Sequence, residues 1–184
     1  MKQVFYTIVF YFFSLINICY SQELFFINNK SYPTNGTFTF TLPNPDFYDE
    51  LEVLVAKDGT KGILAFSIKS DYSVVTGKSI LYLENGSVIN LIDRFIYDNL
   101  DGVSTTVYYL TPSEIEILKK FNILKIRFSE GPPKGHPAEC RNYSAENFYM
   151  REKTFMYGRD NVNDFYDEKI RETTETKNFF NDFF

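Results

Sequence analysis

The sequence predicts a mainly β domain with some helix: an antiparallel sandwich or open barrel with one short capped helix before its last strand. Three observations predict this class. Phe and Tyr supply all the aromatic residues, 18% of the chain, and many of them alternate with polar residues, as in half-buried strands. Turn-forming residues separate the alternating segments at short intervals. Residues 107–128 have the pattern of a strand, a helix and a second strand.

The helix within 107–128 is marked by its first residues. Thr111 is a suitable N-cap, Pro112 fits the first helical position, and Glu114 completes a capping box with Thr111. Ile115 and Leu118 are three residues apart and give the helix an apolar side. This helix either crosses over between two parallel strands or closes one end of a sandwich.

The second strand of this stretch follows the helix directly. Its residues alternate, so that Leu124, Ile126 and Phe128 are predicted to face the core. Lys125 and Arg127, at the intervening positions, are predicted to face water.

The remaining strands are predicted from alternation and from the turns between them. Asn85-Gly86 is the strongest hairpin signal, and we expect a type I′ turn there because both residues tolerate positive φ. Residues 95–102 fit either a strand extension or a loop. The predicted strands are 37–42, 51–57, 63–69, 79–84, 87–92 and 103–110.

The first 21 residues resemble a secretory signal peptide. Lys2 provides a positive start, residues 4–15 are almost wholly apolar, and cleavage after Ser21 fits the small residues before it. Two alternatives are an uncleaved membrane anchor and a lipid anchor on Cys19. The apolar run is short for a membrane span, which needs about 20 residues. We therefore expect a secreted, periplasmic or cell-envelope protein without a membrane span after cleavage.

The mature chain is expected to divide near residue 130. Residues 22–130 form the β-rich domain, and residues 131–184 form a Pro/Gly linker followed by a helical or partly disordered extension. Gly131, Pro132 and Pro133 open the linker, and an approximate heptad spacing of apolar residues indicates helices beyond it. The phenylalanines of 179–184 either dock on the domain or meet a partner, which includes self-association through this tail.

Composition excludes one class of partner. The formal net charge is −5 and no basic cluster stands out, so nucleic acid is not an expected partner. Cys140 is the one cysteine beyond the leader, so no internal disulfide is expected in the mature chain.

Few residues offer chemistry. His136, Glu139 and Cys140 lie close together, but a zinc site usually needs three or four ligands, and this group sits in the proline-rich linker. The same setting argues against a Cys140–His136 nucleophilic pair. We therefore predict no catalytic residue, no metal site and no cofactor.

Two acidic clusters and two tyrosines complete the candidates. Paired carboxylates serve glycoside hydrolysis, but acidic loops on an acidic protein are usually solvated. Tyr108 and Tyr109 are candidate ligand contacts, for which a role in the sheet is the simpler interpretation. The acidic clusters are Asp93, Asp98 and Asp101, and Asp46, Asp49 and Glu50.

Residues 79–128 carry a resemblance. The segments ILYLENGSVINL and YYLTPSEIEILKKFNILKIRF resemble small secreted or envelope proteins of uncharacterised function of the Bacteroidetes type. The resemblance implies a secreted or envelope location and carries no activity to any residue. We expect a non-catalytic module that binds a protein or an envelope component. The alternative is a hydrolase that acts on an extracellular polymer through Asp or Glu side chains.

Overall fold

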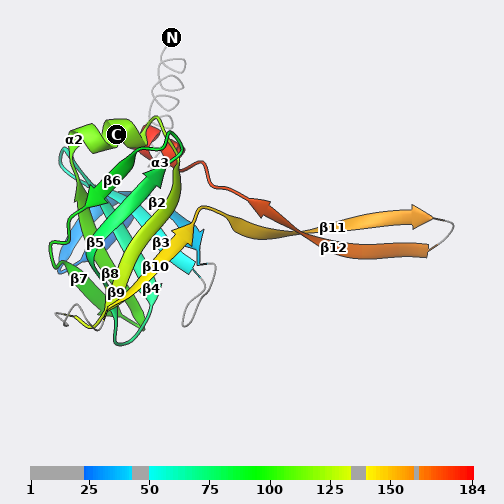
Figure 1. The fold of residues 1–184 in the computed structure, drawn as a ribbon, viewed down its shortest axis with the longest axis horizontal. Coiled ribbons are helices and arrows are strands. Elements are labelled where there is room, and N and C mark those ends of the chain that lie inside the picture. Colours follow the sequence, from blue (N-terminus) through cyan, green and yellow to red (C-terminus); the bar gives the residue numbers. More distant parts are fainter. Residues whose placement is uncertain (1–22, 43–49, 134–139, 160–161) are drawn as a thin grey trace, which may run out of the picture.

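The computed structural model describes residues 23–42, 50–133, 140–159 and 162–184, and of residues 149–171 it describes the backbone. The predicted signal peptide lies outside these ranges. The mainly β class is confirmed: ten strands form one antiparallel sheet that curls into an open barrel (Figure 1). The strands are β1 (Leu24–Ile27), β2 (Lys30–Thr41), β3 (Glu50–Asp58), β4 (Lys61–Lys69), β5 (Val74–Leu83), β6 (Val88–Leu91), β7 (Tyr97–Leu100), β8 (Val103–Leu110), β9 (Ile123–Gly131) and β10 (Arg141–Glu146).

The sheet follows the order β6-β5-β9-β10-β2-β3-β4-β8-β7, with β1 paired to β2. Side chains, rather than a strand ladder, join β5 to β8. The Thr106 hydroxyl donates to the Val75 carbonyl over 2.7 Å. The Ser79 hydroxyl donates to the Tyr108 hydroxyl over 3.0 Å, and the Tyr108 hydroxyl donates to the Gly77 carbonyl over 3.2 Å. These bonds close a seam that the backbone leaves open.

Tyr108→Phe tests this seam. Burial raises the pKa of Tyr108 well above its usual value. The neutral form is therefore favoured in the folded state, and its contribution to stability is complete below about pH 10, the unfolded value, and is lost above it. We expect the variant to lose about 1–2 kcal/mol near neutrality and to weaken less steeply than wild type above pH 10. Urea unfolding at pH 7, 9, 10 and 11 measures both effects, and parallel pH profiles would contradict the second.

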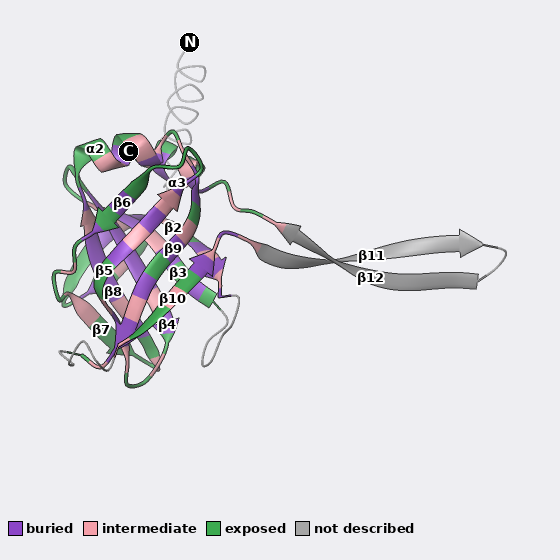
Figure 2. Cartoon of the chain, viewed as in Figure 1, coloured by how far each residue is buried: buried purple, intermediate pink, exposed green. Residues whose placement is uncertain are grey.

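The barrel interior is a single apolar cluster, and a second cluster lies outside the sheet. The interior cluster includes Phe40, Phe66 and Tyr108, each with none of its surface exposed. Ile27 and Tyr32 of the β1–β2 hairpin cover the outer face of β3, β4 and β8. Strand β4 is thus buried on both faces, since residues 62–66 are buried in succession. Figure 2 colours the described residues by burial.

The prediction of a type I′ turn at Asn85-Gly86 is wrong. Gly86 has a positive φ of 81°, but Asn85 does not. The Asn85 side chain instead accepts a hydrogen bond from the Ser87 amide, and the Leu83 amide donates to the Ser87 carbonyl, which makes a three-residue loop. Positive φ at both turn positions occurs between β7 and β8, at Asp101 (52°) and Gly102 (75°). Residues 95–102 therefore contain a strand and its turn.

Helix α2 (Pro112–Leu118) has the predicted start. The Thr111 hydroxyl accepts from the Glu114 amide, and the Glu114 carboxylate accepts from the Thr111 amide, which confirms the capping box. Ile115 and Leu118 are buried. Because β8 and β9 are not neighbours in the sheet, α2 is no parallel crossover and lies at one end of the barrel (Figure 1).

Strand β9 departs from its predicted alternation at one residue. Leu124 is half exposed, and Ile123 is buried in its place. The register explains this: Tyr82 pairs with Lys125 but Leu83 pairs with Ile123, so Leu124 is an extra residue in the ladder. A bulge of this kind moves one side chain to the opposite face. Ile126 and Phe128 face the core as predicted.

The C-terminal segment is mostly strand, not helix. Ser144 lies in β10, and the region with heptad spacing, for which helices were predicted, forms a two-stranded hairpin of β11 (Tyr149–Arg159) and β12 (Val162–Glu172). Helix α3 (Thr176–Asn181) is the one helix the structure describes after residue 131. Three strands therefore follow α2 and β9, where the prediction had β9 as the last strand. Apolar residues at heptad-like spacings can also lie on two strands that a turn separates.

The phenylalanines of residues 179–184 dock on the barrel. This was one of the two alternatives that the sequence left open. Phe180 is completely buried in the interior cluster, and Phe179 contacts Phe38 with ring centroids 4.8 Å apart. The Lys57 ammonium donates to the Phe183 carbonyl over 2.8 Å and lies 4.1 Å from the centroid of its ring. Helix α3 and the residues after it are thus part of the barrel core.

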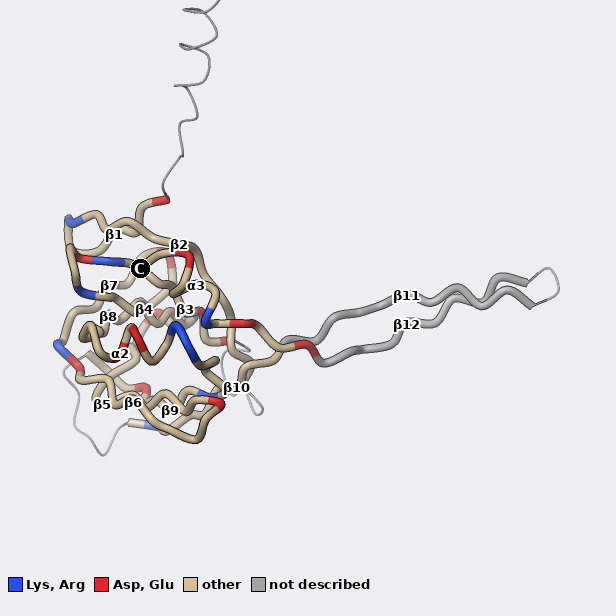
Figure 3. The backbone as a smooth tube through the Cα atoms, turned by 90° about the horizontal axis from the view of Figure 1, so that it is seen from above, with Lys and Arg blue, Asp and Glu red and all other residues tan. Residues whose placement is uncertain are grey.

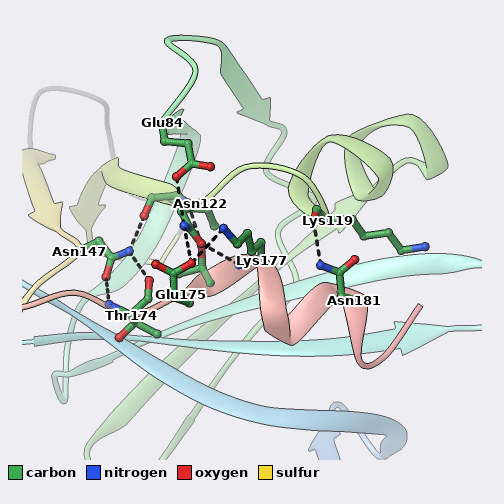
Figure 4. A network of polar contacts seen from close by, with 10 residues as sticks. Glu84, Lys119, Asn122, Asn147, Thr174, Glu175, Lys177 and Asn181 are labelled. Atoms are coloured by element: carbon green, nitrogen blue, oxygen red, sulfur yellow. Dashed lines mark hydrogen bonds and ion pairs between the residues drawn. The ribbon is translucent and has the colours of Figure 1, made fainter.

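Polar contacts fix the return from the hairpin to α3 (Figure 4). The Asn147 amide group donates to the Ile123 and Thr174 carbonyls over 2.7 and 2.8 Å, and its oxygen accepts from the Thr174 amide. Asn122 donates to Glu84 and Glu175, and its oxygen accepts from the Lys177 amide. The hydrogen bond from Asn122 lowers the pKa of the Glu175 carboxyl. We call the Asn147–Thr174 contact the clamp, since it joins the two strands where the hairpin leaves the barrel.

No helix within the described part of the chain has the length and apolar character that crossing a membrane requires.

Candidate functional site

The candidate metal and nucleophile group is only partly described. His136 and Glu139 lie outside the described residues. Cys140 is half-buried beside Gly131, where a Cβ atom would come within 2.6 Å of its sulfur. Among the residues that the structure describes, no three His, Cys, Asp or Glu side chains gather as metal ligands would.

The first acidic cluster shapes a loop. One Asp93 oxygen accepts from the Phe95 amide and the other from the Gly77 amide, both over 2.7 Å. Asp98 accepts from the Asn99 amide, and Asp101 is a turn residue with positive φ. These carboxylates serve the backbone of the loop and do not converge on a common point of attack.

The described residue of the second acidic cluster and the two tyrosines also have positions that the fold explains. Asp46 and Asp49 lie outside the described residues, and Glu50 is exposed at the start of β3. Tyr108 is a buried core residue that joins the β5–β8 seam. Tyr109 packs against the outer cluster, where burial raises its pKa. The structure thus shows both tyrosines packed within the sheet, as the simpler interpretation of the sequence had it.

A groove on the outside of β5, β9 and β10 brings together residues that the sequence did not single out as a site. It has a volume of about 600 Å³ and is open to solvent, within the range of ordinary ligand sites. Its floor is continuous sheet, because β9 pairs with β5 on one side and with β10 on the other. The described lining residues are Tyr82, Leu124, Lys125, Arg127, Asn142, Tyr143 and Ser144.

The charge of the groove is opposite to that of the chain. Two of its described lining residues are cationic and none is acidic, whereas the whole chain carries −5. Lys125 pairs with Glu146 over 3.3 Å, a partly exposed contact worth little. Arg127 is exposed, lies in register with Ile80 and Ser144, and has no ion-pair partner among the described residues. Elsewhere basic and acidic residues are interspersed around the barrel (Figure 3).

Aromatic and amide groups lie beside these cations. Tyr143 lies opposite the buried Phe128 in the ladder and stacks on it, with ring centroids 5.7 Å apart, so its ring packs against the barrel interior. Burial raises the pKa of the Tyr143 hydroxyl above its usual value. The Asn142 oxygen accepts from the Ser129 hydroxyl, which orients the amide group. The groove therefore offers the Tyr82 ring, an oriented amide group and a guanidinium that has no ion-pair partner among the described residues.

A second groove of about 420 Å³ lies at the opposite end of β9. Asp71 and Glu130 both line it, together with two cations, Lys69 and Arg141. Glu130 is 7% exposed, and it pairs in register with Arg141. This is the one groove described in which two carboxylates share a wall.

No protein-family model, curated protein or solved structure matches this chain. The two grooves are therefore interpreted from their own chemistry.

Proposed function

We propose that this protein is a secreted or cell-envelope binding module without a catalytic role, and that the β5–β9–β10 groove binds an acidic polysaccharide of the envelope. The observation that carries the proposal is a groove with cationic and aromatic lining on a protein of negative net charge. The resemblance of residues 79–128 to secreted envelope proteins supports the same location.

The cationic residues of the groove favour a ligand of negative charge. Arg127 presents a guanidinium whose planar donors match a carboxylate or a sulfate. None of the described lining residues is acidic, so an anionic ligand meets no carboxylate among them. A neutral polymer would leave this guanidinium hydrated and would gain nothing from it.

The backbone of the floor favours a sugar over an extended peptide. Peptides that bind sheets add a strand through free backbone groups. Here β9 is paired on both sides, so recognition falls to side chains. The apolar face of Tyr82 suits the C–H faces of sugar rings, and Asn142 and Ser144 supply hydrogen bonds to hydroxyls. A linear polymer fits the open shape of the groove.

Binding to alginate, with dextran as the neutral probe, tests this proposal. We expect wild type to bind alginate and not dextran, and we expect Arg127→Glu to weaken binding by about tenfold or more, which corresponds to 1.4 kcal/mol. Lys30→Glu is the matched control, since it makes the same charge change at an exposed residue of β2 outside the groove. Equal losses in the two variants, or no binding of any acidic polysaccharide, would overturn the proposal.

The hydrolase alternative has one specific observation, the shared wall of Asp71 and Glu130 in the second groove. Retaining and inverting glycosidases both use two carboxylates that flank the scissile bond. The same incubations, assayed for new reducing ends, distinguish the two functions. Release of reducing ends that Asp71→Asn abolishes would establish the hydrolase and remove the non-catalytic proposal.

A further inference from the structure

The β11–β12 hairpin is a two-stranded ribbon that extends away from the barrel (Figure 1). Each strand has 11 residues, and within the described part of the chain each pairs in a ladder with the other alone. Two-stranded ribbons are marginally stable in water, and their outer edges carry unpaired N–H and C=O groups. The ribbon therefore has an 11-residue edge on each side that accepts a further strand.

The barrel holds both strands of this ribbon at the base, where they leave the barrel. The clamp joins Asn147, which precedes β11, to Thr174, which follows β12. Beyond the clamp, Thr176 accepts a buried hydrogen bond from the Ile123 amide, and Phe180 anchors the chain in the core. Both strands of the ribbon are therefore anchored to the barrel at their base.

We propose that the outer edge of β11 pairs antiparallel with the same edge of a second copy of this chain, about a two-fold axis at Thr154. The result is a four-stranded sheet shared by two protomers. Length supports this occupant, because the barrel's end strands β6 and β7 have four residues each and the ribbon's edge has 11. An isologous contact of this kind closes after two copies and leaves no further β11 edge free.

The residue types of β11 complement one another in this register. Thr154 is the central residue of the strand, so residues whose numbers sum to 308 come opposite each other. Each cation of β11 then lies opposite an aromatic residue of the second copy, and no charged residue lies directly opposite a like charge. The cation pairs are Arg151 with Tyr157, Lys153 with Phe155, and Arg159 with Tyr149.

The other edge of the ribbon lacks this complementarity. The central residue of β12 is Asp167, so the symmetric pairing of two β12 edges sets two aspartates opposite each other. Like charges at directly opposed positions destabilise a sheet. The sequence therefore favours β11 as the edge that pairs.

Cysteine cross-linking tests the axis. The whole chain is used with Cys19 and Cys140 replaced by Ala, so that an introduced cysteine is the one thiol present. Thr154→Cys places two thiols opposite each other, at a Cα separation of about 4.5–5.5 Å that suits a disulfide. Glu152→Cys, two residues away on the same edge, is the matched control, since the two copies of residue 152 come about 13–14 Å apart.

We expect light scattering to give twice the chain mass for wild type, and mild oxidation to give a covalent dimer in Thr154→Cys and none in Glu152→Cys. Thr154→Asp, with two carboxylates at the axis, is expected to return the protein to monomer, whereas Thr154→Asn retains the dimer. A wild-type monomer at the concentrations used for cross-linking, a larger assembly, or equal cross-linking of both cysteine variants would overturn the proposal.

Discussion

Replacing Phe180 by alanine is expected to lower the free energy of unfolding by about 3–5 kcal/mol, the usual cost of removing a buried aromatic ring. The ring belongs to α3 but is completely buried within the barrel cluster. Its loss leaves a cavity beneath Phe179, Phe183 and Phe184, which pack over it. Chemical denaturation followed by far-UV circular dichroism measures the change.

The control is an identical substitution at an exposed ring. Phe26 on β1 has 69% of its surface exposed, so Phe26→Ala is expected to change stability by no more than about 0.5 kcal/mol. Comparable losses in the two variants would mean that α3 does not complete the core in solution. A stable Phe180→Ala variant would lead to the same conclusion.

Asn147→Asp is expected to cost about 3–5 kcal/mol at neutral pH, as an unpaired buried charge does. Asn147 is 5% exposed, and its amide nitrogen donates to two carbonyl oxygens. A carboxylate would set a negative oxygen against both of them. The variant should open the clamp, which hydrogen exchange of the Thr174 amide reports.

The deficit should depend on pH. Burial and the two carbonyls disfavour the charged form, so the pKa of the introduced carboxyl is raised in the folded state. Stability is then retained below the unfolded pKa of about 3.9 and is lost as pH rises. Asn142→Asp in the neighbouring strand is the control, because it is exposed and keeps its acceptor for Ser129. A deficit that grows in acid would contradict this account of Asn147.

Local signals made parts of the fold predictable. Helix α2 begins where Thr111, Pro112 and Glu114 place it, because a capping box is formed by residues within one turn. Strands β3, β4 and β8 lie where alternation placed them, to within two residues, whereas β1 was not predicted. The C-terminal strands could not be predicted from local signals, because Tyr143 and Ser144 lie in a strand through their pairing with Phe128 and Arg127.

The groove was harder to predict than the fold. It collects outward positions from three strands, so Tyr82, Arg127 and Asn142 meet only once the order β5-β9-β10 is known. One signal was present in the sequence: Lys125 and Arg127 alternate with core residues and were predicted to face water. The bulge at Leu124 gave no such signal, because it arises from the register with Leu83.

The position of Phe180 in the chain also bears on how the protein is made. Its ring fills a core whose other members begin at Phe38, so the core is incomplete until residue 180 has left the ribosome. The β strands that emerge earlier cannot form a finished domain in the meantime, and their apolar faces remain exposed. We therefore expect a folding step that follows the synthesis of residue 180, with holding chaperones occupying those faces until then.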